Sequence, residues 1–141
     1  MLAVKTYTQD HIDGCRSQME AQLAAYADLV AAAGSSKAAT RAAVEAFEPR
    51  FFNNLTLVLD AYFMHRTRAL EGKDGNPLNE VRMLCSSLLT NDGVLAADKT
   101  IKYNPETSVS KLKVGDEIRL DEKQFLLLFE AFFAEIEQRF T

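Results

Sequence analysis

The chain has 141 residues, of which 48% are hydrophobic and 26% charged, and its formal net charge is −4. A chain of this size forms one domain that buries enough apolar surface to fold without disulfides or a structural metal. The acidic balance argues against nucleic-acid binding and against electrostatic docking on an anionic membrane, since both require clustered Lys and Arg.

The apolar runs, the N-terminal segment and the cysteines of the sequence indicate a cytoplasmic location. No apolar run approaches the ~18 residues needed to cross a bilayer, and the segment Met1–Thr6 lacks the charged-then-apolar order of a signal peptide. Cys15 and Cys85 are far apart and have no CxxC neighbour, so reduced core thiols are expected rather than a redox pair. We therefore predict a cytoplasmic protein with no membrane partner.

The spacing of apolar residues predicts a mainly α-helical fold, a compact bundle of four to five helices in a single domain over residues 1–141. The first helix is expected from Gln9 to Ala33, where apolar side chains recur every three or four residues and form one narrow stripe. Thr8 or Asp10 is placed to cap its N-terminus.

The centre of the chain carries its most apolar helical pattern. A helical segment begins near Ser36 and meets Pro49, which has no N–H and clashes with the preceding turn. The chain therefore either kinks at Pro49 or starts a new helix there, and the sequence leaves both open. A helix is expected over Pro49–Glu71, with Gly72 as its left-handed cap.

Beyond Gly72 the pattern changes twice. Asn76-Pro77 is a typical helix start and predicts a helix over Pro77–Leu89. From about 94 to 120 the helical period is lost and short alternating runs flank Gly115-Asp116, which predicts a small β-ribbon inserted before the C-terminal helix. This segment is locally basic, which solvated strand faces explain, with a lid or a docking edge as the alternative; the lysines are Lys99, Lys102, Lys111 and Lys113.

The last helix, predicted over Asp121–Phe140, has a wide apolar face. Asp121, with Gln124 three residues later, indicates a capping box at its start. Aromatic and aliphatic residues cover more than half of its circumference, whereas a terminal helix with one neighbour needs a narrower stripe. The helix is therefore either central to the bundle or shared with a second copy, and we expect a homodimer through apolar helix surface, with the C-terminal helix as one option.

The residue patterns of common chemistries are missing from the sequence. Only two histidines, His11 and His65, accompany the two cysteines, and no spacing matches a zinc or di-iron ligand set. There is no GxSxG, Walker A or GxGxxG motif. In a continuous helix, His65 and Asp60 would point ~140° apart and form no dyad, so a half-buried His65 with a local hydrogen bond is expected. We predict no catalytic residues, no metal and no cofactor.

One basic cluster forms a candidate anion-binding site. Its members are His65, Arg66, Arg68, Lys73 and Arg82. Arg66 lies in line with the apolar stripe of the expected helix, and the turn that follows leads into a helix N-terminus, whose free N–H groups favour an anion. Alternatively, these side chains extend to solvent or pair with nearby acids, for which Asp74 and Glu80 are available.

Two functions fit these patterns best; a third, a regulatory partner of nucleic-acid machinery, is weaker because the acidic balance makes any such role indirect. The first is a non-enzymatic helical interaction or small-ligand-binding module that acts as a homodimer. The alternative is a small enzyme or sensor that binds an anionic small molecule, a phosphate or carboxylate, near the 65–82 helix-turn-helix. The missing catalytic constellation favours the first, and an open pocket beside Arg66 would favour the second.

Overall fold

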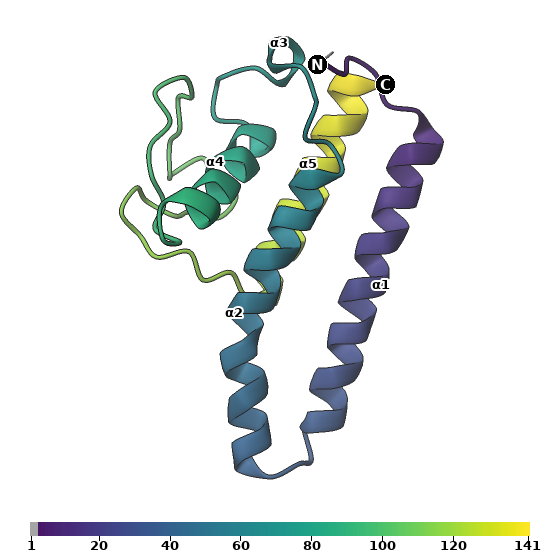
Figure 1. Cartoon of the computed structure of the whole chain (residues 1–141), viewed down its shortest axis with the longest axis vertical. Coiled ribbons are helices and arrows are strands. Elements are labelled where there is room, and N and C mark those ends of the chain that lie inside the picture. Colours follow the sequence, from purple (N-terminus) through teal and green to yellow (C-terminus); the bar gives the residue numbers. More distant parts are fainter. Residues whose placement is uncertain (1–2) are drawn as a thin grey trace.

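Two long helices form an antiparallel hairpin that runs the length of the molecule, and the rest of the chain packs against one side of it (Figure 1). The computed structural model describes residues 3–141, so Met1 and Leu2 of the segment assessed above lie outside the described residues. The helices are α1 (Gln9–Ala33), α2 (Ala38–Ala61), α3 (Arg68–Glu71), α4 (Pro77–Thr90) and α5 (Glu122–Phe140). α5 lies behind α2 in Figure 1, and α4 packs on both. The predicted mainly helical fold is confirmed.

Side-chain caps confirm three of the predicted helix starts. At the start of α1, Thr8 Oγ1 accepts a hydrogen bond from the His11 backbone N–H at 3.1 Å. Asn76 accepts from an N–H in the first turn of α4 at 2.9 Å. Asp121 and Gln124 form a complete capping box at the start of α5. These bonds satisfy N–H groups that have no partner inside the helix.

Helix α2 runs through Pro49 without a break, so the segments on either side of this residue belong to one helix. Because proline has no N–H, the carbonyl of Glu45 lacks its partner in the helical ladder. The packing of α2 against its neighbours outweighs this local loss.

The end of α2 differs from the prediction, since the helix stops at Ala61 and not at Glu71. The chain then turns, and Val4 forms a parallel bridge with Arg66 through two backbone hydrogen bonds of 2.7 and 2.8 Å. These tertiary bonds replace the helical ladder. Gly72, with φ of 79°, ends the single turn of α3 instead.

The predicted β-ribbon over 94–120 is wrong, because the structure contains no strand within residues 3–141. The segment has one isolated antiparallel bridge, between Val94 and Glu117, which joins its two ends. The turn at Gly115 is present, with φ of 97°. The runs on either side of that turn do not pair with each other.

Side chains of the helices take the place of a neighbouring strand. Asn53 of α2 donates to the Ile118 carbonyl at 2.8 Å and accepts from the Leu120 N–H at 3.1 Å. The buried carboxylate of Glu80 on α4 accepts from two N–H groups of the loop, both at 2.8 Å. Ile101, Ile118 and Leu120 are buried. The alternating pattern therefore reflects an extended chain lying on helices, not pairing between strands.

Helix α5 is central to the core, and this position accounts for its wide apolar face. Its buried residues are Phe125, Leu128, Phe129, Phe132, Phe133, Ile136 and Phe140. The ring centre of Phe133 lies 5.0 Å from that of Phe129 and 5.8 Å from that of Phe63, beyond the end of α2. From α1, the Arg16 guanidinium lies 4.5 Å from the centre of the Phe133 ring. Such aromatic and cation–π contacts add to the area that is buried.

The central position of α5 predicts a large contrast between two of its residues. Phe133→Ala should lower the free energy of unfolding by about 3–5 kcal/mol, because it removes a fully buried ring and leaves a cavity. Leu127→Ala on the exposed side of α5 should change it by less than about 0.5 kcal/mol. Urea titration followed by circular dichroism measures both, and equal effects would contradict the central placement.

Candidate functional site

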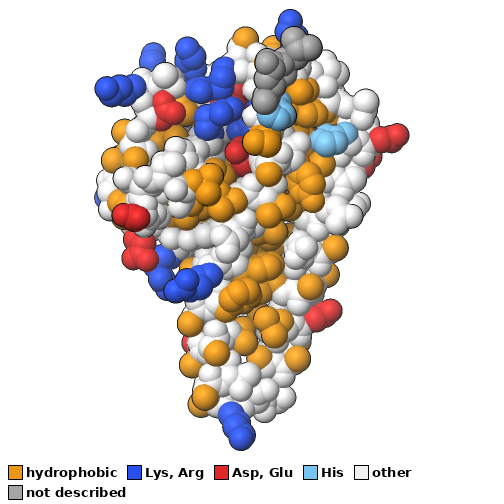
Figure 2. Space-filling view, in the orientation of Figure 1, with side chains coloured by type: hydrophobic (Ala, Val, Ile, Leu, Met, Phe, Trp, Pro, Cys, Tyr) orange, Lys and Arg blue, Asp and Glu red, His pale blue; other side chains and the backbone are white. Residues whose placement is uncertain are grey.

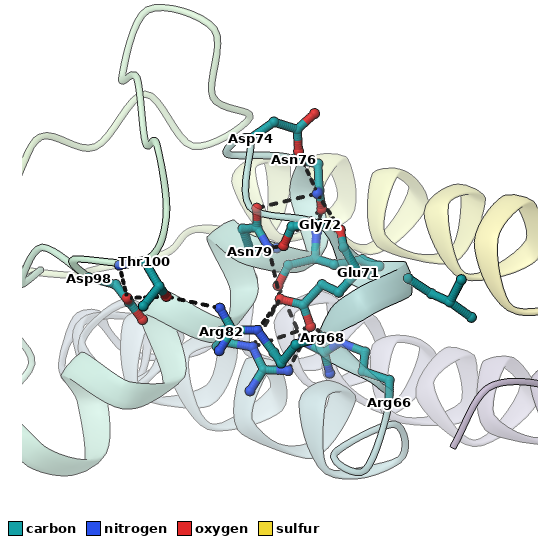
Figure 3. Close-up of polar contacts among 12 residues, drawn as sticks. Arg66, Arg68, Glu71, Gly72, Asp74, Asn76, Asn79, Arg82, Asp98 and Thr100 are labelled. Atoms are coloured by element: carbon teal, nitrogen blue, oxygen red, sulfur yellow. Dashed lines mark hydrogen bonds and ion pairs between the residues drawn. The ribbon is translucent and has the colours of Figure 1, made fainter. Parts of the chain in front are cut away.

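A buried carboxylate, that of Glu71 in α3, organises the polar residues at one end of the bundle. Arg66 Nε donates to its Oε1 at 2.7 Å, and Asn79 Nδ2 donates to its Oε2 at 2.8 Å (Figure 3). Arg82 of α4 binds both oxygens, with Nη2 at 2.6 Å from Oε1 and Nε at 2.9 Å from Oε2. The Glu71 side chain is fully buried, so these donors replace all of its hydration.

Arg66, which the sequence placed in the anion site, is used internally. Its side chain is fully buried. Besides Glu71, its guanidinium contacts Asp60 Oδ1 at 2.9 Å and the backbone carbonyls of Phe63 at 3.0 Å and Leu78 at 3.2 Å. No N–H group of Arg66 is left facing solvent, so this residue has no means to contact a bound ligand.

The two acids considered as partners for the arginines have other roles. Asp74 Oδ1 accepts from Asn76 Nδ2 at 2.8 Å, and Glu80 binds the loop backbone described above. The acids that pair with Arg66 are Glu71 and Asp60. Sequence spacing missed both, because it assumed one continuous helix over Pro49–Glu71, whereas α2 ends at Ala61.

Two competing effects set the pKa of Glu71. Burial raises it, while the hydrogen bond from Arg82 and the positive charges of Arg66 and Arg82 lower it. The cationic partners prevail, so the pKa lies below its ordinary value of 4.5. Glu71 is therefore ionised at neutral pH and forms charge-assisted hydrogen bonds.

The turn between α3 and α4 fixes the position of Glu71. Asn76 Nδ2 donates to the Glu71 carbonyl at 2.7 Å, and Arg139 of α5 donates to the same carbonyl at 3.1 Å. Gly75 has φ of 86°, and a Cβ there would lie 2.4 Å from the Lys102 carbonyl oxygen. Only glycine fits such a close approach. Gly75 therefore allows the 94–120 segment to pack directly against the turn.

Of the remaining predicted residues, Arg68 joins the Glu71 network and His65 and Lys73 do not. Arg68 Nε lies 3.8 Å from Glu71 Oε2, and its Nη2 donates to Thr100 Oγ1 at 3.1 Å. The side chains of Lys73 and His65 are exposed, and no hydrogen bond within residues 3–141 links either to Glu71. His65 was expected to be half-buried; it is exposed because α2 ends before it.

The second candidate site is an apolar groove on the side of the hairpin opposite α5, here called the α1–α2 groove. It is lined by Gln18, Met19 and Gln22 of α1 and by Phe51, Asn54, Leu55, Val58 and Tyr62, with a volume of about 200 Å³. None of these residues is charged. Figure 2 shows a band of hydrophobic side chains along this face. By helical spacing, the exposed residues Leu29, seven after Gln22, and Phe47, four before Phe51, continue the lining toward the hairpin tip.

The cysteines form no activated thiol. Cys15 Sγ lies 3.5 Å from His11 Nε2, but the same nitrogen lies 3.2 Å from the Tyr62 carbonyl oxygen, which only accepts. Nε2 therefore carries the proton and is no base toward Cys15. Burial raises the pKa of the thiols of Cys15 and Cys85, which are both free.

Comparisons with known proteins give no indication of function, so the fold and the two candidate sites are the basis for the functional proposal. The chain matches no protein-family model, and it has no significant match among curated proteins or solved structures. Within residues 3–141, no three His, Cys, Asp or Glu side chains are grouped closely enough to hold a metal ion. None of the helices there has the length and apolar character to span a membrane.

The ionic network predicts a pH-dependent contribution to stability. Glu71→Gln leaves the buried guanidinium groups without their carboxylate and should lower the free energy of unfolding at pH 7 by about 3 kcal/mol. Since the folded pKa is depressed, the wild-type advantage should be complete above the ordinary value of 4.5 and should vanish as pH falls through the lower folded value.

Urea titrations of both proteins between pH 7 and pH 3 measure this difference. Glu130→Gln is the matched control, because this carboxylate is exposed and, within residues 3–141, pairs only with Arg16 at 3.2 Å. It should leave stability nearly unchanged. A Glu71→Gln difference that stays constant down to pH 3 would contradict the role given to the ionised carboxylate.

Proposed function

We propose that this chain is a non-enzymatic helical interaction module, and that it acts as a homodimer whose contact surface is the α1–α2 groove. The observation that carries the proposal is the continuous apolar face of the hairpin on the side that α5 leaves open. The apolar residues of α2 and its C-cap on this face recur in steps of three and four, at Phe47, Phe51, Leu55, Val58 and Tyr62. This is the spacing of a helix that packs on another helix.

The hairpin extends beyond the part that α5 supports. The N–H of Glu122, at the start of α5, lies 3.4 Å from a carboxylate oxygen of Glu48, which marks the level where α5 begins. Between Gly34 and Phe47, on the far side of that level, no residue is buried. Two helices alone bury little apolar surface, so a third and fourth helix from another copy would complete a bundle.

The size of the surface suits a stable dimer. α2 has 24 residues, which corresponds to a length of about 36 Å, and two helices side by side are about 20 Å wide. The face therefore offers about 700 Å² per copy, close to the ~800 Å² that each partner contributes to an interface of standard size.

The chemistry of the groove favours a second copy as its occupant. A two-fold interface places the same residues on both sides, so a charged lining would repel itself. The polar residues of the lining, Gln18, Gln22 and Asn54, are neutral amides that both donate and accept hydrogen bonds. The C-terminal helix, the option considered from sequence, is less suitable because its aromatic residues are used inside the core.

The proposal includes a cytoplasmic location and no catalytic activity. Two buried cysteines that remain free fit a reducing compartment. The unactivated thiol of Cys15 and the internal use of Arg66 favour a binding role over a catalytic one.

A single charge in the groove tests the homodimer. Val58 is 42% exposed, so Val58→Glu should fold normally yet place a buried carboxylate in the interface. We expect light scattering at micromolar concentration to give twice the chain mass for the wild type and the monomer mass for Val58→Glu. Leu89→Glu is the control, because Leu89 on α4 is 71% exposed and lies outside the groove.

Two results would overturn the proposal. A wild-type protein that stays monomeric across this concentration range would contradict the homodimer. A dimer that persists in Val58→Glu, with an unchanged dissociation constant, would place the interface on another face of the molecule.

A further inference from the structure

A second surface, at the end of the molecule that carries α3, concentrates positive charge. Figure 2 shows Lys and Arg side chains gathered at this end. Arg68 and Arg82 lie at its base, with side chains 38% and 26% exposed. Around them, the backbone N–H of Lys102 donates to the Lys73 carbonyl at 2.8 Å, which brings two exposed lysines together. Lys99 precedes Thr100, the residue that contacts Arg68.

Glu71 holds Arg82 by hydrogen bonds, Thr100 holds Arg68, and each guanidinium keeps a free edge. Arg82 uses Nε and Nη2 on the carboxylate, and its Nη1 has no acceptor among the described residues. Arg68 gives Nη2 to Thr100, and its Nη1 likewise has no acceptor there. Arg68 Nε is buried without any hydrogen-bond partner within residues 3–141. Glu71 thus orients the guanidinium of Arg82, and Thr100 orients that of Arg68, before any ligand arrives.

The charges at this surface do not balance. Five cationic groups belong to it, namely Arg68, Arg82, Lys73, Lys99 and Lys102. Three carboxylates lie among them, those of Glu71, Asp74 and Asp98, while Arg66 and Asp60 form an internal pair. The local excess is therefore two positive charges, in a chain whose formal net charge is −4.

A cavity of about 260 Å³ lies next to the arginines. Residues from the second half of α4 and from the following loop line it, including Met83, Ser86, Thr90, Asp98 and Lys99. Ser86 is four residues after Arg82 on the same helix, so the two side chains are neighbours. Asp98 accepts from the hydroxyl of Thr100 at 2.7 Å. Neither arginine lines the cavity itself, but Thr100 connects its rim at Asp98 to Arg68.

We propose that Arg68 and Arg82 bind the phosphate group of a small phosphorylated molecule, whose remaining part occupies this cavity. A phosphate monoester carries ≈ −1.5 to −2 charges at pH 7 and three strong acceptor oxygens, which match the local excess and the free guanidinium edges. A monocarboxylate has one charge and two oxygens. Thr100 is a positioning residue, because it accepts from Arg68 and does not need to contact the ligand.

The experiment is a calorimetric titration with glycerol phosphate and with inorganic phosphate, at ionic strength held constant with sodium chloride. We expect saturable binding of both, tighter for glycerol phosphate because its organic part reaches the cavity. Arg68→Gln should weaken binding by about tenfold or more, as expected when a charge-assisted hydrogen bond is lost. Arg119→Gln is the matched control, since this arginine is exposed and its one carboxylate partner among the described residues is Glu117 at 3.4 Å.

Asp98→Asn gives a second, opposite readout. This change removes the negative charge closest to Thr100 while keeping its hydrogen bond, and phosphate should bind more tightly. A thermal melt without ligand shows that each variant folds. The site is independent of the groove, so monomeric Val58→Glu should bind as the wild type does.

The proposal is overturned if phosphate produces no saturable heat beyond the chloride control, or if Arg68→Gln and Arg119→Gln weaken binding equally. Equal affinities for glycerol phosphate and inorganic phosphate would show that the organic part of the ligand does not occupy the cavity. Tighter binding to Asp98→Asn together with loss in Arg68→Gln would establish it.

Discussion

The requirement to neutralise one buried carboxylate shapes this end of the fold. Glu71 is enclosed by Arg66, Arg82 and Asn79, which come from the turn after α2 and from α4. An ionised group without water is stable only when donors surround it. The chain therefore has to leave the helical path after Ala61, bring Arg66 inward and place α4 beside α3. The same carboxylate directs the free edge of Arg82 outward, so one interaction serves both packing and surface chemistry.

The aromatic core separates the two surfaces to which we assign roles. α5 occupies the middle of the molecule and presents its phenylalanines to α1, α2 and α4. On the side of the hairpin that faces α5 the core is complete, whereas no helix covers the opposite side, which carries the α1–α2 groove. The charged surface lies at the end of the molecule that carries α3. A partner in the groove and a ligand on the arginines would therefore not compete for the same residues.

The sequence predicted those features that depend on local chemistry. The caps at Thr8, Asn76 and Asp121 and the limits of α1 follow from side chains next to the backbone they bind. It did not predict the end of α2, because the chain beyond this helix is held by backbone bonds to Val4, which lies about sixty residues earlier in the sequence. The β-ribbon was inferred from alternation, but alternation records which side chains are buried and not what the backbone bonds to; Asn53 and Glu80 supply those bonds. Within the basic cluster, proximity of Arg66, Arg68 and Arg82 was foreseen, whereas their common acid was hidden by the wrong helix length.

Pro49 lies in α2 close to the level where α5 begins, and this coincidence has a dynamic consequence. On one side of it the backbone amides of α2 are covered by α5 and α4, and on the other side, from Ala38 to Phe47, no side chain is buried. The ladder is also interrupted at this point, where Glu45 has no amide to bind. In a single copy, local opening of the hairpin tip therefore does not require the core to open. In monomeric Val58→Glu, amide hydrogens before Pro49 should exchange with solvent deuterium much faster than those after it.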